Sequence, residues 1–330
     1  MSDALSLRPF RRLALATVVA VYLLIGVGGL VRASGAGMGC PDWPKCFGQW
    51  VPPTAESQLP ANYQEIYAEH GYGSSRFNVV KTWTEYINRL IGVVIGFLIF
   101  GTWIASWRTF RGRDGGLVAW CFSAFLLVGF QGWLGSVVVD SNLAPWLVTV
   151  HMILALVIVG ILIYALARSQ REVFDVDAIE PSGRIDLLFA ACLVLSMVQI
   201  GLGSQIREHI DELGAAAVAR ADWIESLGLG IYVHRSLSLL VFAANVALVW
   251  SLRQASRTAN SVASLGNGLL VVLALEIAVG AVMFYFAVPA FLQPVHLVLA
   301  AVGGGLQLGM LIGYRYSSGS RAAGPLPATT

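Results

Sequence analysis

Long uninterrupted apolar runs are the feature that most limits what this chain can fold into. A helix needs roughly 20 apolar residues to cross a bilayer. Only 12% of the residues are charged, against about a quarter in soluble chains. The runs are too long for the strands of a barrel. We therefore predict an all-α integral membrane protein with eight transmembrane helices, near residues 13–32, 82–107, 115–139, 146–167, 187–206, 229–251, 268–289 and 294–314.

The distribution of Lys and Arg predicts the orientation of these helices. With the N-terminus inside, thirteen Lys and Arg residues fall in inner segments and six in outer ones, so both termini are expected in the cytoplasm. The first run follows Arg8, Arg11 and Arg12 and resembles a signal peptide, but seven more spans follow it, and we expect it to be retained. Lys45 and Lys81 are the only lysines. This preference for arginine, and the absence of a transit peptide, favour a multi-pass protein of a bacterial plasma membrane.

The chain also contains an internal repeat, because several motifs recur at nearly constant spacing. Asn88-Arg89 lies 146 residues before His234-Arg235, and His151 lies 145 residues before His296. Four helices per half predict two tandem, pseudo-symmetric four-helix bundles. The predicted parts are a first bundle at 1–167 with a large outer loop at 33–81, a cytoplasmic linker at 168–186 that we expect to be solvated, a second bundle at 187–315, and a flexible tail at 316–330.

Histidines near the outer helix ends predict a haem site. His234 and His296 each lie within about two turns of such an end, and ionisable residues inside spans are functional by default. Two neutral imidazoles from facing helices can ligate a haem iron on both sides. We interpret His234 and His296 as axial haem ligands. The alternatives are histidines bonded to backbone groups, or a proton relay.

In the first half the equivalent pair is Asn88 and His151. Asparagine is a poor iron ligand, so this half is expected to hold a porphyrin through one imidazole or to keep a coordination position open. The alternative is a degenerate half-site that is merely packed. Glu85 lies three residues before Asn88, on the same helix face, whereas its repeat counterpart is Ile231. This asymmetry favours chemistry in the first half, with an ion pair to Arg89 as the alternative or additional role.

Other polar residues suggest supporting roles. Arg89 and Arg235 are candidate partners of haem propionates, which need forked cationic donors. Two roles fit Glu276 in the seventh span: a proton relay, or a protonated carboxyl held by a hydrogen bond. Cys40 and Cys46 lie in an outer segment, which is expected to face an oxidising compartment. This favours a disulfide between them, either structural or redox-active. The net charge of +2 says little about partners, and nothing in the sequence suggests a nucleic acid partner.

With these residues assembled, the chain resembles the haem A synthase family from about residue 10 to 315. The specific stretches are Gly28 to Cys46, the Glu85-x-x-Asn-Arg89 motif, Gln199 to Glu208, and the single positions His151, His234-Arg235 and His296. One departure is that this chain has Asn88 where the family pattern has histidine. We predict His151 as the sole imidazole ligand in the first half.

The resemblance implies eight helices in two bundles, a low-spin haem b on His234 and His296, and substrate haem O at Asn88 and His151. It implies oxidation of a haem O methyl to a formyl group, by successive hydroxylations with oxygen from water. Glu85 matches the essential carboxylate of the family, and Cys40 and Cys46 match its disulfide. The family also implies partnership with haem O synthase, within membrane lipid. The electron acceptor stays unknown, and a homo-oligomer is compatible with the sequence.

Two other functions remain open at this point. The first is a di-haem b-type cytochrome that carries electrons from quinol without modifying haem. Confinement of Glu85 to one half argues against it, because electron transfer alone needs no such carboxylate. The second is a parallel-repeat transporter whose histidines form a proton path. Absence of a Soret band would favour the transporter.

Overall fold

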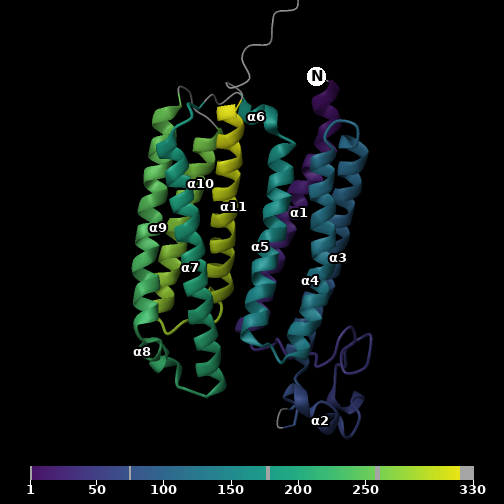
Figure 1. Ribbon diagram of the computed structural model, residues 1–330. Helices are drawn as coiled ribbons and strands as arrows, with labels where there is room; N and C mark the ends of the chain where they lie inside the picture. Colours follow the sequence, from purple (N-terminus) through teal and green to yellow (C-terminus); the bar gives the residue numbers. More distant parts are fainter. Residues whose placement is uncertain (1, 74–75, 176–178, 257–260, 320–330) are drawn as a thin grey trace, which may run out of the picture. The chain divides into compact units, whose positions relative to one another are not determined.

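Eight long helices and their short connections make up the structure, a computed structural model that describes residues 2–73, 76–175, 179–256 and 261–319 (Figure 1). No strand occurs among the described residues. All eight long helices are long and apolar enough to cross a membrane, which confirms the predicted number of spans. They are α1 (Ser2–Ala33), α3 (Val79–Phe110), α4 (Gly115–Asp140), α5 (Pro145–Arg168), α7 (Gly183–Ala215), α9 (Gly228–Ala255), α10 (Ser261–Tyr285) and α11 (Leu292–Gly319).

Local sequence signals explain several helix ends. The side chain of Asn78 caps α3 by accepting from the backbone N–H of Lys81, and Asp114 caps α4 through Leu117 N–H. The seventh span was predicted to continue to residue 289, but α10 ends at Tyr285. Ala287 and Val288 have left-handed backbone conformations, so the chain turns there although its composition stays apolar. Hydropathy does not register such a turn.

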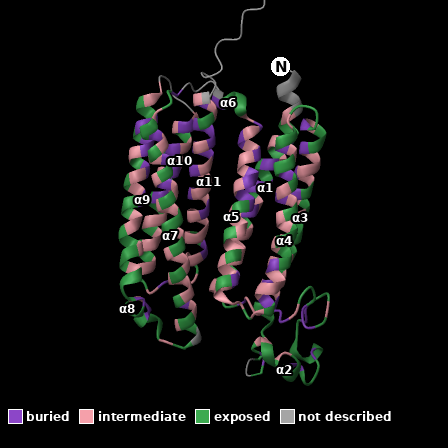
Figure 2. Ribbon diagram, viewed as in Figure 1, coloured by how far each residue is buried: buried purple, intermediate pink, exposed green. Residues whose placement is uncertain are grey.

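Large apolar side chains are exposed along these helices. Phe97 in α3 is 71% exposed and Trp250 in α9 is 61% exposed (Figure 2). In water such surfaces would be costly, whereas a bilayer core accommodates them. The exposure and the helix lengths together describe a multi-pass membrane protein.

The chain divides into two compact units, with the boundary between Leu162 and Ile163 inside α5. This lies a few residues before the predicted border at 167. The first unit contains α1, α3, α4 and most of α5. Its interior includes an edge-to-face contact of Phe10 with Phe110 at 5.1 Å and a hydrogen bond between the buried hydroxyls of Thr17 and Thr102 at 2.9 Å.

The second unit contains α7, α9, α10 and α11, with the short helix α6 (Arg171–Asp175) packed on α11. Phe174 and Ile179 are buried in its apolar core. The hydroxyl of Ser317 donates to the carbonyl of Phe174 at 3.0 Å. The linker is therefore not the wholly solvated segment that its charges suggested. Residues 176–178 of the linker lie outside the described residues.

α11 continues to Gly319, past residue 315 where the sequence placed the start of the tail. Ser317 is buried in this helix, and its hydroxyl donates to the carbonyl of Gly313 at 2.8 Å. The predicted flexible tail therefore begins inside a helix. Residues 320–330 lie outside the described residues.

The segment between α1 and α3, residues 34–78, folds into a small domain that we call the cap. It includes α2 (Tyr63–Ile66) and two short 3-10 turns, η1 (Glu56–Gln58) and η2 (Ala68–His70). Figure 1 shows the cap at the end of the first unit where α3 begins and α4 ends. Its core is a cluster of buried apolar residues that surrounds Phe47: Cys40, Cys46, Leu59, Tyr63 and Tyr72.

Hydrogen bonds hold the cap together and also join it to the helices. Burial raises the pKa of Tyr72 well above its ordinary value, so its hydroxyl stays protonated and donates to the carbonyls of Met38 (3.0 Å) and Gly39 (3.2 Å). At the α4–α5 turn the side chain of Asn142 donates to the carbonyl of Glu69 at 2.8 Å. The cap therefore contacts the turn between α4 and α5.

Gly39 provides a test of how closely the cap packs. A Cβ at Gly39 would lie 2.3 Å from the backbone carbonyl oxygen of Lys81, so a side chain cannot be accommodated without moving the cap from α3. We expect Gly39→Ala to destabilise the protein by about 1–3 kcal/mol, the usual cost of overpacking. The matched control is Gly73→Ala, also in the cap, whose Cβ would make ordinary contacts at 3.6 Å. Thermal unfolding in detergent measures both. Equal midpoints for the two variants would contradict the packing argument.

Candidate functional site

Buried positions gather in one half of each unit, away from the candidate ligands. In α9 every buried residue lies at Val241 or later, whereas His234 lies near the start of the helix. In α10 the buried residues end at Leu273, although the helix continues to Tyr285. The first unit has a related pattern, since α3 buries positions from Ile95 onward besides the two that meet the cap. The ends that carry the histidines are thus packed less tightly than the opposite ends (Figure 2).

The structure brings His234 and His296 together. α9 and α11 carry them near their first turns, and the centres of the two imidazole rings are 6.4 Å apart with ring planes at 72°. The Nδ1 atom of each ring is buried and has no hydrogen-bond partner within the described residues. Buried polar atoms are normally bonded, so two such orphans side by side indicate that a ligand completes this site.

A glycine on the neighbouring helix faces each histidine ring. A Cβ at Gly203 of α7 would lie 3.2 Å from Cε1 of His234, and one at Gly280 of α10 would lie 3.4 Å from Cε1 of His296. Any larger residue would push against the ring. The two glycines therefore allow both imidazoles to lie close to the adjoining helices.

The first unit repeats this arrangement for only one of its two ligand positions. Gly135 of α4 faces His151 with the same hypothetical Cβ–Cε1 distance of 3.4 Å, and the Nδ1 atom of His151 also has no partner in the described part of the chain. At the other position, by contrast, a Cβ at Gly28 would meet nothing within 4 Å. Gly28 corresponds to Gly203 in the repeat, and Asn88 is the repeat counterpart of His234, the residue that Gly203 faces.

The second position of the first unit is Asn88, whose Oδ1 atom is buried without a hydrogen-bond partner among the described residues. The first unit thus presents one imidazole and one amide, each with an unpartnered polar atom, where the second unit presents two imidazoles.

The side chains of two glutamines donate hydrogen bonds to backbone carbonyls of the histidines, a role that was not predicted. The side-chain amide of Gln131 donates to the carbonyl of His151 at 2.9 Å, and that of Gln199 donates to the carbonyl of His234 at 3.1 Å. Both link the histidine helix to its neighbour. The only sequence signal was that these glutamines stand beside the repeated glycines, as Gln131-Gly-Trp-Leu-Gly135 and Gln199-Ile-Gly-Leu-Gly203.

Glu85 is 4% exposed and forms an ion pair with Arg89. Its other carboxylate oxygen accepts the backbone N–H of Cys40 at 2.5 Å. Arg89 in turn donates to the backbone carbonyls of Cys40 (3.0 Å), Asp42 (2.6 Å) and Lys45 (3.0 Å). The expected ion pair is present, and it extends into the cap. In contrast to the sequence expectation, the N–H groups of Arg89 are engaged by protein and leave none for a propionate.

Cys40 and Cys46 form the predicted disulfide. It closes a ring of residues 40–46, whose conformation is also held by Asp42, because the two oxygens of this carboxylate accept the backbone N–H groups of Phe47 and Gly48. The free cysteines, Cys121 and Cys192, are buried in the helices.

Arg235 has different surroundings from Arg89, although the two are repeat counterparts. It is exposed, and its guanidinium lies over the rings of Tyr232 at 5.3 Å and Phe284 at 4.9 Å. No hydrogen bond of the Arg235 guanidinium is found among the residues that the structure describes. Its donors are available for an acidic ligand.

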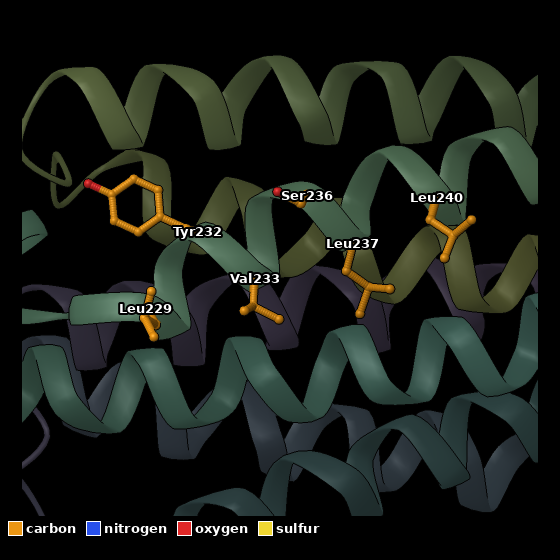
Figure 3. A pocket seen from close by; sticks show the side chains of 6 residues that line it. All are labelled: Leu229, Tyr232, Val233, Ser236, Leu237 and Leu240. Atoms are coloured by element: carbon orange, nitrogen blue, oxygen red, sulfur yellow. The ribbon is translucent and has the colours of Figure 1, made fainter.

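The apolar depression shown in Figure 3 lies on α9, and neither His234 nor His296 lines it. It has a volume of about 470 Å³ and is lined by Leu229, Tyr232, Val233, Ser236, Leu237 and Leu240. The depression is shallow, and Leu229 and Leu240 are exposed. A surface of this kind is expected where a helix faces lipid, so we do not assign it to the site.

Comparison with known proteins identifies the family. Residues 11–303 match the sequence profile of the COX15-CtaA family, described as cytochrome oxidase assembly proteins. The chain belongs to this family. The match covers all eight helices in whole or in part, together with the cap and every candidate residue described above.

Curated relatives in this family include proteins named haem A synthase. The protein of Methylobacterium radiotolerans is 27% identical over 316 residues, which cover 85% of this chain and 83% of the relative. That of Ruegeria sp. is 26% identical, with 86% and 82% covered. The protein of Shewanella oneidensis is 28% identical over 217 residues, which cover 64% of this chain and 62% of the relative. This last match therefore spans less than two thirds of the relative's length.

Proposed function

We propose that this protein is a haem A synthase, an oxidoreductase that converts a methyl group of haem O to a formyl group. Family membership and the names of the relatives support this proposal. The observation that carries it is the half-buried pair His234 and His296, whose ring centres are 6.4 Å apart and whose Nδ1 atoms are buried without a partner among the described residues. Within the described residues, no three His, Cys, Asp or Glu side chains cluster as an ordinary metal site requires, whereas a haem iron needs only one or two ligands from the protein.

The His234–His296 pair fits a haem b. A metal–imidazole bond is ~2 Å long, so an iron held between two imidazoles separates the ring centres by roughly 6 Å, which is two bonds plus two ring radii. The ring centres here are 6.4 Å apart. The looser packing at this end of α9 and α10 supports the same assignment. Bound there, a haem b would supply a one-electron carrier.

Arg235 is our candidate partner for a propionate of that haem. Its guanidinium is exposed and is placed over two aromatic rings, which orient it without using its N–H donors. An arginine fork suits a carboxylate better than a lysine would. Gly203 and Gly280 keep the adjoining helices clear of the ligand rings.

Substrate haem O is proposed to bind in the first unit, with His151 as its imidazole ligand. Asn88 takes the position of a second ligand, and its Oδ1 atom is buried without a partner among the described residues. A Cβ at Gly28 would meet nothing within 4 Å, which fits the absence of a second imidazole. The first unit would therefore leave one face of the substrate iron without a protein ligand. Asn88 is suited to donate a hydrogen bond to a small molecule on that face.

The reaction proceeds in balanced steps. Each hydroxylation adds an oxygen from water and removes two electrons and two protons, first giving the alcohol and then the hydrated aldehyde, which loses water to leave the formyl group. We propose that Glu85 takes up a proton or orients the water, as a buried carboxylate at the same helix face as Asn88 can do. The electron acceptor beyond the protein is not identified by any residue here.

The cellular setting follows from the chemistry and the sequence. Haem O synthase is the proposed supplier of the substrate, because the haem must already carry its farnesyl chain. The bacterial plasma membrane is the proposed location, with the haem sites toward the extracytoplasmic side, where an oxidising compartment suits the disulfide of Cys40 and Cys46.

The first test is the product itself. Expression in cells that make haem O should yield haem A on extraction and mass analysis, and Glu85→Gln should lower its amount by about a hundredfold or more, the usual weight of a general acid or base. The control is Thr82→Val, which removes another hydrogen bond to the cap, at 2.8 Å to the carbonyl of Gly39, without removing a carboxylate. We expect it to cost tenfold at most. A haem-containing wild type without haem A would favour the di-haem cytochrome, and a colourless one the transporter.

The second test addresses the haem b ligands. Gly203→Val should push the His234 ring from its place and lower the b-type absorbance of the purified protein, as His234→Ala should. The control is Gly201→Val, two residues away on the same helix, where a Cβ would meet nothing within 4 Å. Haem content per protein, read from the Soret band, is the measurement. Full absorbance in Gly203→Val would refute the assigned contact.

The third test addresses the first unit. In a His296→Ala background, which removes the haem b signal, bound haem O should show the spectrum of an iron with one imidazole and should take up added imidazole. Asn88→His should convert it to a low-spin spectrum without added imidazole, whereas Asn88→Leu should not. Electron paramagnetic resonance distinguishes these states. Two protein imidazoles on haem O in the parent protein would show that His151 is not the sole ligand.

A further inference from the structure

The guanidinium of Arg89 is saturated by bonds to Glu85 and to the ring formed by residues 40–46. Its Nε and Nη2 atoms donate to one carboxylate oxygen of Glu85. Nη1 donates to the carbonyls of Asp42 and Lys45, and Nη2 also donates to that of Cys40. Arginine has five N–H donors, and these contacts use them all.

The same ring is bound to Glu85 directly. The second carboxylate oxygen of Glu85 accepts the N–H of Cys40. Glu85 therefore binds an N–H group of the ring backbone, whereas Arg89 binds its carbonyls. The disulfide holds Cys40 and Cys46 together, which keeps the three carbonyls directed at one guanidinium. The side chains of Arg89 and Glu85 are only 12% and 5% exposed. Removal of either one would therefore leave the charge of the other uncompensated.

The second unit provides an internal comparison. There the counterpart of Glu85 is Ile231, and no disulfide ring is found in the described part of that unit. The guanidinium of Arg235 lies over the rings of Tyr232 and Phe284, and it makes no hydrogen bond within the described residues. Two arginines at equivalent repeat positions are thus used differently. A role at a haem propionate fits Arg235, whereas the contacts of Arg89 are those of a residue that fixes a loop.

We propose that Arg89 is a positioning residue, which holds the disulfide-closed ring against α3 and thereby sets the position of the Glu85 carboxylate. This inference rests on the proposed function, in which Glu85 serves the oxidation of haem O. Arg89 reaches the reaction only through Glu85 and the ring. Lysine cannot replace it fully, since an ammonium has three donors on one nitrogen and lacks the planar fork that spans Glu85 and three carbonyls.

The first readout is the rate at which a charged, water-soluble phosphine reduces the Cys40–Cys46 disulfide in the purified full-length protein. Trapping of the new thiols with a maleimide and intact-mass analysis gives the rate. Arg89→Gln should raise it on the order of tenfold, as expected from loss of charged hydrogen bonds, and Arg89→Lys should lie between it and the parent. Arg207→Gln is the matched control, because it breaks another i,i+4 ion pair, with Asp211, on α7. We expect no change there.

The second readout separates turnover from substrate binding. With haem O as substrate, Arg89→Lys should lower kcat about tenfold or more while KM changes less than threefold, because Glu85 is displaced and the porphyrin contacts are kept. An unchanged reduction rate together with a raised KM would overturn the proposal and make Arg89 a propionate partner. If Arg89→Gln does not fold, as judged by loss of the b-type spectrum, Arg89→Lys decides. Disulfide reduction needs no haem A formation, so a failure of the proposed function would be seen separately.

Discussion

Exclusion of water from eight apolar helices is the constraint on which this structure depends. Backbone groups are satisfied within each helix, and a polar side chain in a span must find a partner or bind a ligand. Most do find partners: the hydroxyls of Thr17 and Thr102 bond to each other, and the buried amide of Gln307 donates to Asn245 at 3.0 Å. The Nδ1 atoms of the three membrane histidines are among the exceptions, because they are buried without a partner among the described residues.

Duplication explains why the exceptions are so regular. A histidine near the start of a helix faces a glycine on the neighbouring helix, and this pair occurs three times, at His151, His234 and His296. The Nδ1 atom of each of these rings is without a hydrogen-bond partner among the described residues. At the fourth position the glycine remains but the histidine is replaced by Asn88. The same scaffold therefore offers two imidazoles in the second unit and one imidazole with an amide in the first.

The cap adds a further difference between the units. It places a disulfide-closed ring at the end of the first unit that carries Asn88, and the buried pair of Glu85 and Arg89 joins the ring to α3. In the second unit Ile231 stands in place of the carboxylate. Among the described residues, the guanidinium of Arg235 donates to no backbone carbonyl. Divergence of one half toward substrate chemistry and of the other toward electron storage is a consistent physical explanation for both changes.

The sequence by itself determined the number of helices, the repeat, the disulfide and the identity of the candidate ligands. It could do so because apolar runs of bilayer length allow only helices, and because a histidine or a carboxylate inside such a run is costly enough to indicate function. The end of α10 at Tyr285 was missed, since a left-handed turn at Ala287 and Val288 leaves the apolar composition unchanged. The burial of Phe174 and Ile179 was missed for a related reason, because the charges around them suggested a solvated segment. Only the tertiary structure decided that Arg89 is engaged by the cap while Arg235 is not, and that glycines face the histidine rings. Such contacts join residues far apart in the chain, and their geometry is set by how the helices and the cap pack.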